Sequence, residues 1–125
     1  MKSRSAYLPG LAAGLGLVWA TVVWGHAFPA RSEPRVGAVV RTAPTRVQIW
    51  FDGELEPAFS TLSVTDAAGT RVDRGDARVD GENRRLLRVS LAALRPGEYK
   101  VRWRVLAVDG HRTEGDYTFT VKPPE

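Results

Sequence analysis

The strongest constraint on the fold of this chain is a period-two alternation of apolar and polar residues. In residues 99–105 the apolar positions are Tyr99, Val101, Trp103 and Val105, and the positions between them are Lys100, Arg102 and Arg104. Successive side chains of an extended strand point to opposite faces, so this pattern is typical of a strand with one face buried. Residues 47–51 alternate in the same way. No window shows a sustained 3.6-residue period, so we expect an all-β fold.

Shorter alternating runs predict further strands at residues 62–65, 86–89 and 117–121. Turn residues separate these runs at 66–69, which should close a hairpin toward 70–72, and at 80–83 and 95–97. Five to seven short strands in about 100 residues predict a Greek-key, immunoglobulin-like β-sandwich. A small closed β-barrel is the alternative.

The first 25 residues differ in character from the rest of the chain. Lys2 and Arg4 precede a run without charge at residues 5–25, which is the layout of a secretory signal peptide. The run is also long enough to span a bilayer as an uncleaved anchor. Cleavage is the preferred interpretation, because Pro9 and several glycines weaken the run as a permanent helix. We therefore expect a cleaved signal peptide at 1–25 and one exported domain at 26–125.

Two cleavage sites fit the small residues at the end of this run. Cleavage after Gly25 makes His26 the first residue of the mature chain. Cleavage after Ala27 fits as well, and it removes that histidine. The sequence alone leaves both sites open.

Composition narrows the classes of function. The chain contains no cysteine, so an exported domain of this size depends on its core or on a ligand for stability. Its 18 basic residues are interleaved with 14 acidic ones, and the net charge of +4 falls to +2 without Lys2 and Arg4. Charges distributed in this way are typical of solvated strand faces, so a nucleic-acid partner is not expected.

Two histidines are the candidate metal ligands. If cleavage follows Gly25, the α-amine and imidazole of His26 can chelate an ion. His111 follows Asp109 by two positions, so in an extended segment both side chains would project from one face. Two imidazoles, an amine and a carboxylate form a ligand set that suits Cu(II). Met1 is the only methionine, which argues against a methionine-based Cu(I) site.

The ordinary interpretation of the same residues is a turn. Asp109 and Gly110 are turn formers, and a histidine between strands is more often a surface residue than a ligand. The histidine and aspartate positions alone do not decide between the two interpretations.

Longer motifs add a family resemblance that covers nearly all of residues 26–121. The matching segments are His26-Ala27-Phe28, Ser32-Glu33-Pro34, Gly37-Ala38, Ala43-Pro44 with residues 47–51, residues 94–105, Val108-Asp109-Gly110-His111, and Gly115 ahead of residues 117–121. The most specific part runs from Pro-Gly-x-Tyr through Trp-Arg to Asp-x-His. In these motifs the chain resembles the CopC family of copper-resistance proteins.

The resemblance implies a periplasmic, non-enzymatic β-sandwich that binds one Cu(II) through His26, Asp109 and His111. Its implied role is copper resistance, homeostasis or delivery to a membrane copper transporter of the CopD type. We expect a monomer, anchored to the membrane if the first segment is retained. Some family members have a glutamate ligand just after the strand at 47–51, but here that position falls in Asp52-Gly53-Glu54, so neither acid is assigned.

Two other classes of function compete with a copper carrier. An N-terminal histidine with a second imidazole is similar to the histidine brace of copper monooxygenases, which are enzymes. A metal-free, immunoglobulin-like interaction module would also fit the fold, because sandwiches carry many functions.

Overall fold

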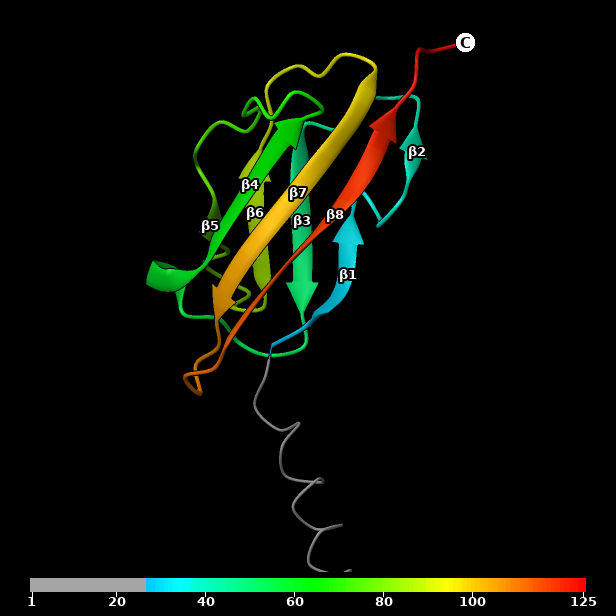
Figure 1. The fold of residues 1–125 in the computed structure, drawn as a ribbon. Helices are drawn as coiled ribbons and strands as arrows, with labels where there is room; N and C mark the ends of the chain where they lie inside the picture. Colours follow the sequence, from blue (N-terminus) through cyan, green and yellow to red (C-terminus); the bar gives the residue numbers. More distant parts are fainter. Residues whose placement is uncertain (1–26) are drawn as a thin grey trace, which may run out of the picture.

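Two four-stranded sheets account for most of the residues that the computed structural model describes, which are residues 27–125 (Figure 1). The expected signal peptide, its cleavage after Gly25 and the candidate ligand His26 lie outside the described residues. The strands are β1 (Pro29–Glu33), β2 (Val39–Val40), β3 (Arg46–Phe51), β4 (Thr61–Asp66), β5 (Arg78–Val79), β6 (Leu86–Ser90), β7 (Gly97–Leu106) and β8 (Arg112–Val121).

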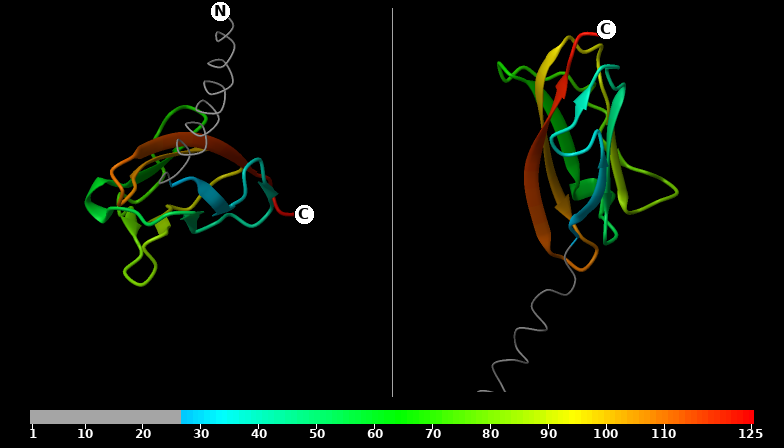
Figure 2. Two further views of the ribbon diagram at one scale, coloured as in Figure 1. Left: turned by 90° about the horizontal axis from the view of Figure 1, so that it is seen from below. Right: turned by 90° about the vertical axis from the view of Figure 1, so that its right-hand side faces the viewer.

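One sheet has the strand order β1-β3-β6-β5, and the other has the order β2-β8-β7-β4. All neighbouring strands are antiparallel except β2, which runs parallel to β8. The sheets pack face to face as two layers and do not join into a ring (Figure 2). The predicted β-sandwich is confirmed, and the closed barrel is wrong.

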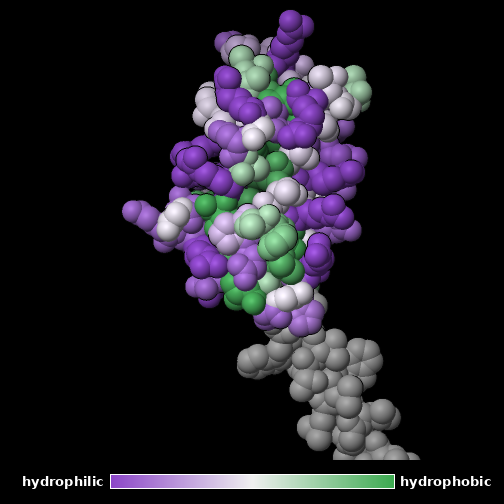
Figure 3. All heavy atoms as spheres, turned by 90° about the vertical axis from the view of Figure 1, so that its left-hand side faces the viewer, coloured by the Kyte–Doolittle hydropathy of each residue, from purple (hydrophilic) through white to green (hydrophobic). Residues whose placement is uncertain are grey.

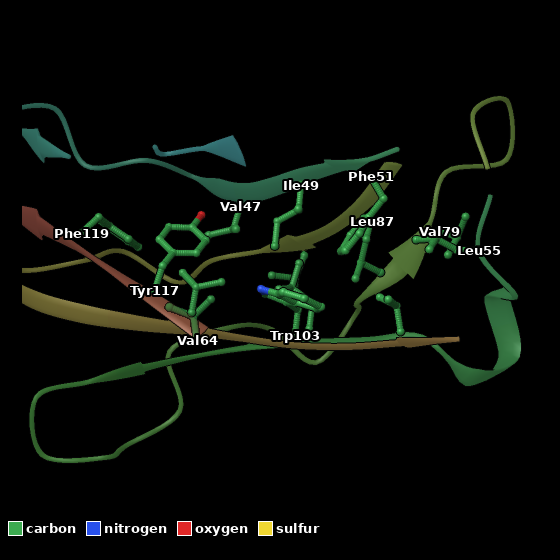
Figure 4. Close-up of a cluster of buried hydrophobic side chains, with 14 of the residues drawn as sticks. Val47, Ile49, Phe51, Leu55, Val64, Val79, Leu87, Trp103, Tyr117 and Phe119 are labelled. Atoms are coloured by element: carbon green, nitrogen blue, oxygen red, sulfur yellow. The ribbon is translucent and has the colours of Figure 1, made fainter. Parts of the chain in front are cut away.

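The core lies between the layers and consists of the apolar positions that alternate along the strands. Figure 4 shows Val47, Ile49 and Phe51 of β3 pointing toward residues of the opposite sheet. The rings of Phe51 and Trp103 form a T-shaped pair, with ring centroids 5.3 Å apart and planes at 75°. Trp103 and Phe119 are both buried, as their inward positions predict.

The polar positions cover the outer faces of the sheets. On the outer face of β3, the guanidinium of Arg31 lies 3.8 Å from the centre of the Trp50 ring. Seen from the β4 and β5 edge, apolar side chains form a band between hydrophilic ones (Figure 3). Phe59 of the 3-10 turn η2 (Pro57–Phe59) is 61% exposed. Within residues 27–125, no helix has the length and apolar character needed to cross a membrane.

The free edge of β4 is covered by the segment that follows it. The predicted turn at 66–69 is present, but the returning residues form only a single bridge, between Thr65 and Arg71. The backbone N–H of Val64 donates to Asp73 Oδ2 over 2.8 Å, and Arg71 donates to both carboxylate oxygens at 2.7 Å. Burial raises the pKa of Asp73, but these bonds and the Arg71 charge outweigh it, so the pKa lies below its usual range.

A buried tyrosine links β8 to the chain that follows β1. The Tyr117 hydroxyl donates a hydrogen bond of 2.8 Å to the backbone oxygen of Pro34. Burial raises the pKa of Tyr117 to about 12, because the charged phenolate would lose its hydration inside the sandwich.

Candidate metal centre

The candidate site is the turn that joins the two longest strands, β7 and β8. The Ala107 N–H donates to the His111 oxygen, and the Gly110 N–H donates to the Ala107 oxygen, both over 2.9 Å. Gly110 has a φ of +95°, a backbone conformation that residues with a side chain rarely adopt. Paired strands on either side therefore hold Asp109 and His111 in a short, closed turn.

The side chains of Asp109 and His111 lie against each other at this turn. Asp109 Oδ1 is 3.3 Å from His111 Nδ1, and the same oxygen accepts the backbone N–H of His111 over 3.1 Å. Residues 108–110 form the turn that Asp109 and Gly110 favour, so the segment between the two side chains is not extended. Within this turn the Asp109 carboxylate accepts the backbone N–H of His111, and its Oδ1 therefore lies close to the Nδ1 of the His111 ring.

Asp109 Oδ1 and His111 Nδ1 suit a metal ion both in their separation and in their chemistry. Donor atoms 3.3 Å apart can each lie about 2 Å from one ion, the usual length of metal–nitrogen and metal–oxygen bonds. The His111 side chain is 54% exposed and the Asp109 side chain 33%, so an ion can reach both directly from solvent. The arrangement suits an ion that is taken up and released.

The start of the described chain lies beside the same turn (Figures 1 and 2). The Ala27 oxygen accepts a 2.7 Å hydrogen bond from the Thr113 hydroxyl, and Thr113 is two residues beyond His111. Ala27 itself is fully buried. Two segments 86 residues apart in sequence therefore meet at this end of the sandwich.

Asp52 and Glu54, the acids that the sequence left unassigned, both contact this end of the molecule. Asp52 Oδ1 accepts the Phe28 N–H over 2.7 Å, and the Asp52 N–H donates to the Phe28 oxygen over 2.9 Å. Glu54 uses its backbone oxygen to accept the Val108 N–H over 3.0 Å. Asp52 thus holds Phe28, near the start of the described residues, and Glu54 holds the turn.

Of the three predicted ligands, the structure brings Asp109 and His111 together, while His26 lies outside the described residues. Among residues 27–125 alone, no group of three or more His, Asp and Glu side chains is arranged to hold a metal. The three-residue ligand set therefore remains a prediction that depends on His26.

Thr113 was missed as part of the site, whereas Asp52 was left open as a possible ligand. Thr113 could have been found from the sequence, because it lies two residues after His111 at the start of a strand. Side chains two residues apart in a strand are expected on the same face. The contact of Asp52 with Phe28 spans 24 residues and has no local signal.

These features define a class: a small two-sheet sandwich with an exposed carboxylate–imidazole pair at one end and the first described residues beside it. The family model described as the CopC domain matches residues 30–122. The chain belongs to the CopC family, as its motifs predicted.

Relatives and solved structures agree with this assignment. Protein YobA of Escherichia coli K12 is 37% identical over 101 residues, which cover 80% of this chain and 82% of that protein. The crystal structure of CopC from Methylosinus trichosporium OB3b has 38% identity and a TM-score of 0.74, with 80% of this chain and 97% of that one covered. The copper transport protein CutJ of Bacillus subtilis is 27% identical over 99 residues, which are 78% of this chain and 18% of that protein. Family and relatives connect this chain to copper.

Proposed function

We propose that this chain is a periplasmic carrier of one Cu(II) ion, held by the N-terminal amine and imidazole of His26 together with Asp109 and His111. The ligand set contains nitrogen and oxygen donors and no sulfur, which suits Cu(II). The protein acts in copper resistance, homeostasis or delivery, and it is not an enzyme. The Asp109 carboxylate takes up a coordination position that oxygen chemistry at copper would need open.

The observation that carries this proposal is the hydrogen bond between Thr113 and Ala27. Consecutive Cα atoms lie about 3.8 Å apart, so residue 26 starts one step from a backbone group fixed beside the β7–β8 turn. His111 lies two residues from Thr113, about 7 Å along an extended chain. An N-terminal histidine is therefore within reach of the Asp109–His111 pair.

The burial of Ala27 supports cleavage after Gly25. Ala27 is fully buried and accepts the Thr113 hydrogen bond, so a cut after Ala27 would remove a core residue and leave the hydroxyl without that acceptor. Cleavage after Gly25 keeps both features. It also gives His26 the free amine that the proposed chelate requires.

Two observations support a role in delivery. The site is exposed at one end of the sandwich, where an ion can pass to a partner without opening the core. The region of CutJ that matches this chain is 18% of a much longer protein named for copper transport. We propose a membrane copper transporter of the CopD type as the partner.

Titration calorimetry of residues 26–125 with Cu(II) tests the proposed function. We expect one ion per chain, and binding at least about tenfold weaker in His111→Ala and Asp109→Ala. Arg112→Ala is the matched control, because Arg112 is an exposed neighbour of His111 outside the ligand set. Wild-type binding that neither ligand variant weakens would refute the site.

A further inference from the structure

The first two described residues are held from both sheets at once. Thr113 of β8 donates to the Ala27 oxygen over 2.7 Å, and Asp52, which follows β3 in the other sheet, pairs with both backbone polar groups of Phe28. We call Thr113 and Asp52, with the Ala27–Phe28 backbone that they bind, the terminal clamp. All of these hydrogen bonds come from protein groups, so the order of the Ala27–Phe28 backbone does not depend on a bound ion.

In the proposed chain that begins at His26, the terminal clamp orders residues next to the new N-terminus, and this order affects metal binding. Chain ends are usually poorly ordered unless something ties them down, and ordering a residue costs conformational entropy. A ligand residue whose neighbours are already fixed avoids much of that cost when the ion binds. The terminal clamp therefore bears on how tightly the neighbouring residue can hold an ion.

The two side chains suit this role for different reasons. Thr113 continues the inward face of β8, which carries Tyr117 and Phe119 further along, so its hydroxyl faces the buried carbonyl of Ala27. Asp52 is exposed, and its Oδ1 accepts the Phe28 N–H over 2.7 Å. Both side chains reach the backbone of the start of the chain.

We infer that Thr113 and Asp52 are positioning residues for the Cu(II) site, acting through the Ala27–Phe28 backbone on the ligand residue that precedes it. This inference rests on the proposed function. It also assigns Asp52 a role other than ligation: the carboxylate acts as a hydrogen-bond acceptor for Phe28.

The experiment compares Cu(II) affinity across paired variants of residues 26–125, measured by competition with a chromophoric chelator. Thr113→Val removes the hydroxyl and Thr113→Ser retains it, while Asp52→Ala removes the acceptor and Asp52→Asn retains an oxygen in its place. We expect affinity about tenfold weaker in Thr113→Val and Asp52→Ala, and near wild type in Thr113→Ser and Asp52→Asn. Thr118→Val on the outer face of β8 is the control and should bind as wild type does.

Two further measurements separate positioning from ligation and from unfolding. The Cu(II) electron paramagnetic resonance spectrum of each saturated variant should match wild type, because the ligands are unchanged. In the metal-free protein, the Phe28 amide should exchange with solvent faster in Thr113→Val than in wild type, while the urea midpoint stays close to that of Thr118→Val.

The outcomes distinguish this inference from the function on which it rests. A wild-type chain that binds no Cu(II) refutes the proposed function and, with it, the inference. A wild-type chain that binds Cu(II) while Thr113→Val binds equally tightly refutes the inference alone. Asp52→Asn that is as weak as Asp52→Ala, with an altered spectrum, identifies Asp52 as a ligand and overturns its assignment here.

Discussion

Gly115 lies opposite Trp103 in the β7–β8 pair, and the indole covers the space that any larger residue would need. A Cβ added at Gly115 would lie 2.7 Å from Trp103 Cζ2 and 3.1 Å from Cε2. Optimal contact between carbon atoms is about 3.5–4.0 Å, so the ring would have to retreat by about 0.8 Å. The Trp103 ring is buried and already forms a T-shaped pair with Phe51, so little free space is available.

The expected effect of Gly115→Ala follows from this geometry. Overpacking of this kind costs about 1–3 kcal/mol. Replacing glycine also restricts the unfolded chain, which offsets the cost by about 0.4–1 kcal/mol. The net expectation is a loss of about 1–2 kcal/mol in the free energy of unfolding.

Urea unfolding followed by tryptophan fluorescence measures this loss. With an m-value of about 1–2 kcal/mol/M, the midpoint should fall by roughly 0.5–2 M. Gly81→Ala is the matched control, because an added Cβ there meets no atom within 4 Å and its φ is not in the left-handed region. Equal midpoints for Gly115→Ala and wild type would refute the argument.

Two ionisable groups in the sandwich give further predictions. Because the pKa of Asp73 is lowered in the folded state, its contribution to stability is complete above its ordinary pKa near 3.8 and is lost as pH falls. Asp73→Asn should therefore cost about 1–3 kcal/mol at pH 7 and show a smaller loss of urea midpoint below pH 4 than wild type; parallel pH profiles would contradict this. Because the pKa of Tyr117 is raised to about 12, its contribution is complete below pH 10 and falls as pH rises toward 12, by up to roughly 2–3 kcal/mol. Tyr117→Phe should lose less stability than wild type between pH 9 and 11.5, and an equal loss in both proteins would count against a buried, neutral Tyr117.

The strands that the sequence predicted are those with one buried face. Residues 47–51 and 99–105 fall within β3 and β7, because their alternation reflects burial between the sheets. By contrast, β1 (Pro29–Glu33) has one buried residue, Ser32, and takes its strand geometry from pairing with β3. The two-residue strands β2 and β5 are too short for any periodic signal.

In the candidate site, too, local features could be predicted from the sequence and contacts between distant residues could not. The spacing of Asp109 and His111 made them candidates, the family motif around them selected them as ligands, and the structure places Asp109 Oδ1 3.3 Å from His111 Nδ1. The bond from Thr113 to Ala27 spans 86 residues, and its existence depends on how the sheets pack. Local sequence patterns carry no information on that packing.

The most direct test of the central claim is the role of the free amine of His26. Cu(II) affinity is measured for residues 26–125 and for residues 25–125, which differ only by Gly25 at the start. The extension converts the amine of His26 into a peptide nitrogen and leaves Asp109 and His111 unchanged. Loss of a ligand should exceed the 10–100-fold cost of losing a partner of a ligand, so we predict affinity more than about 100-fold weaker for residues 25–125. Equal affinity of the two chains would contradict the account.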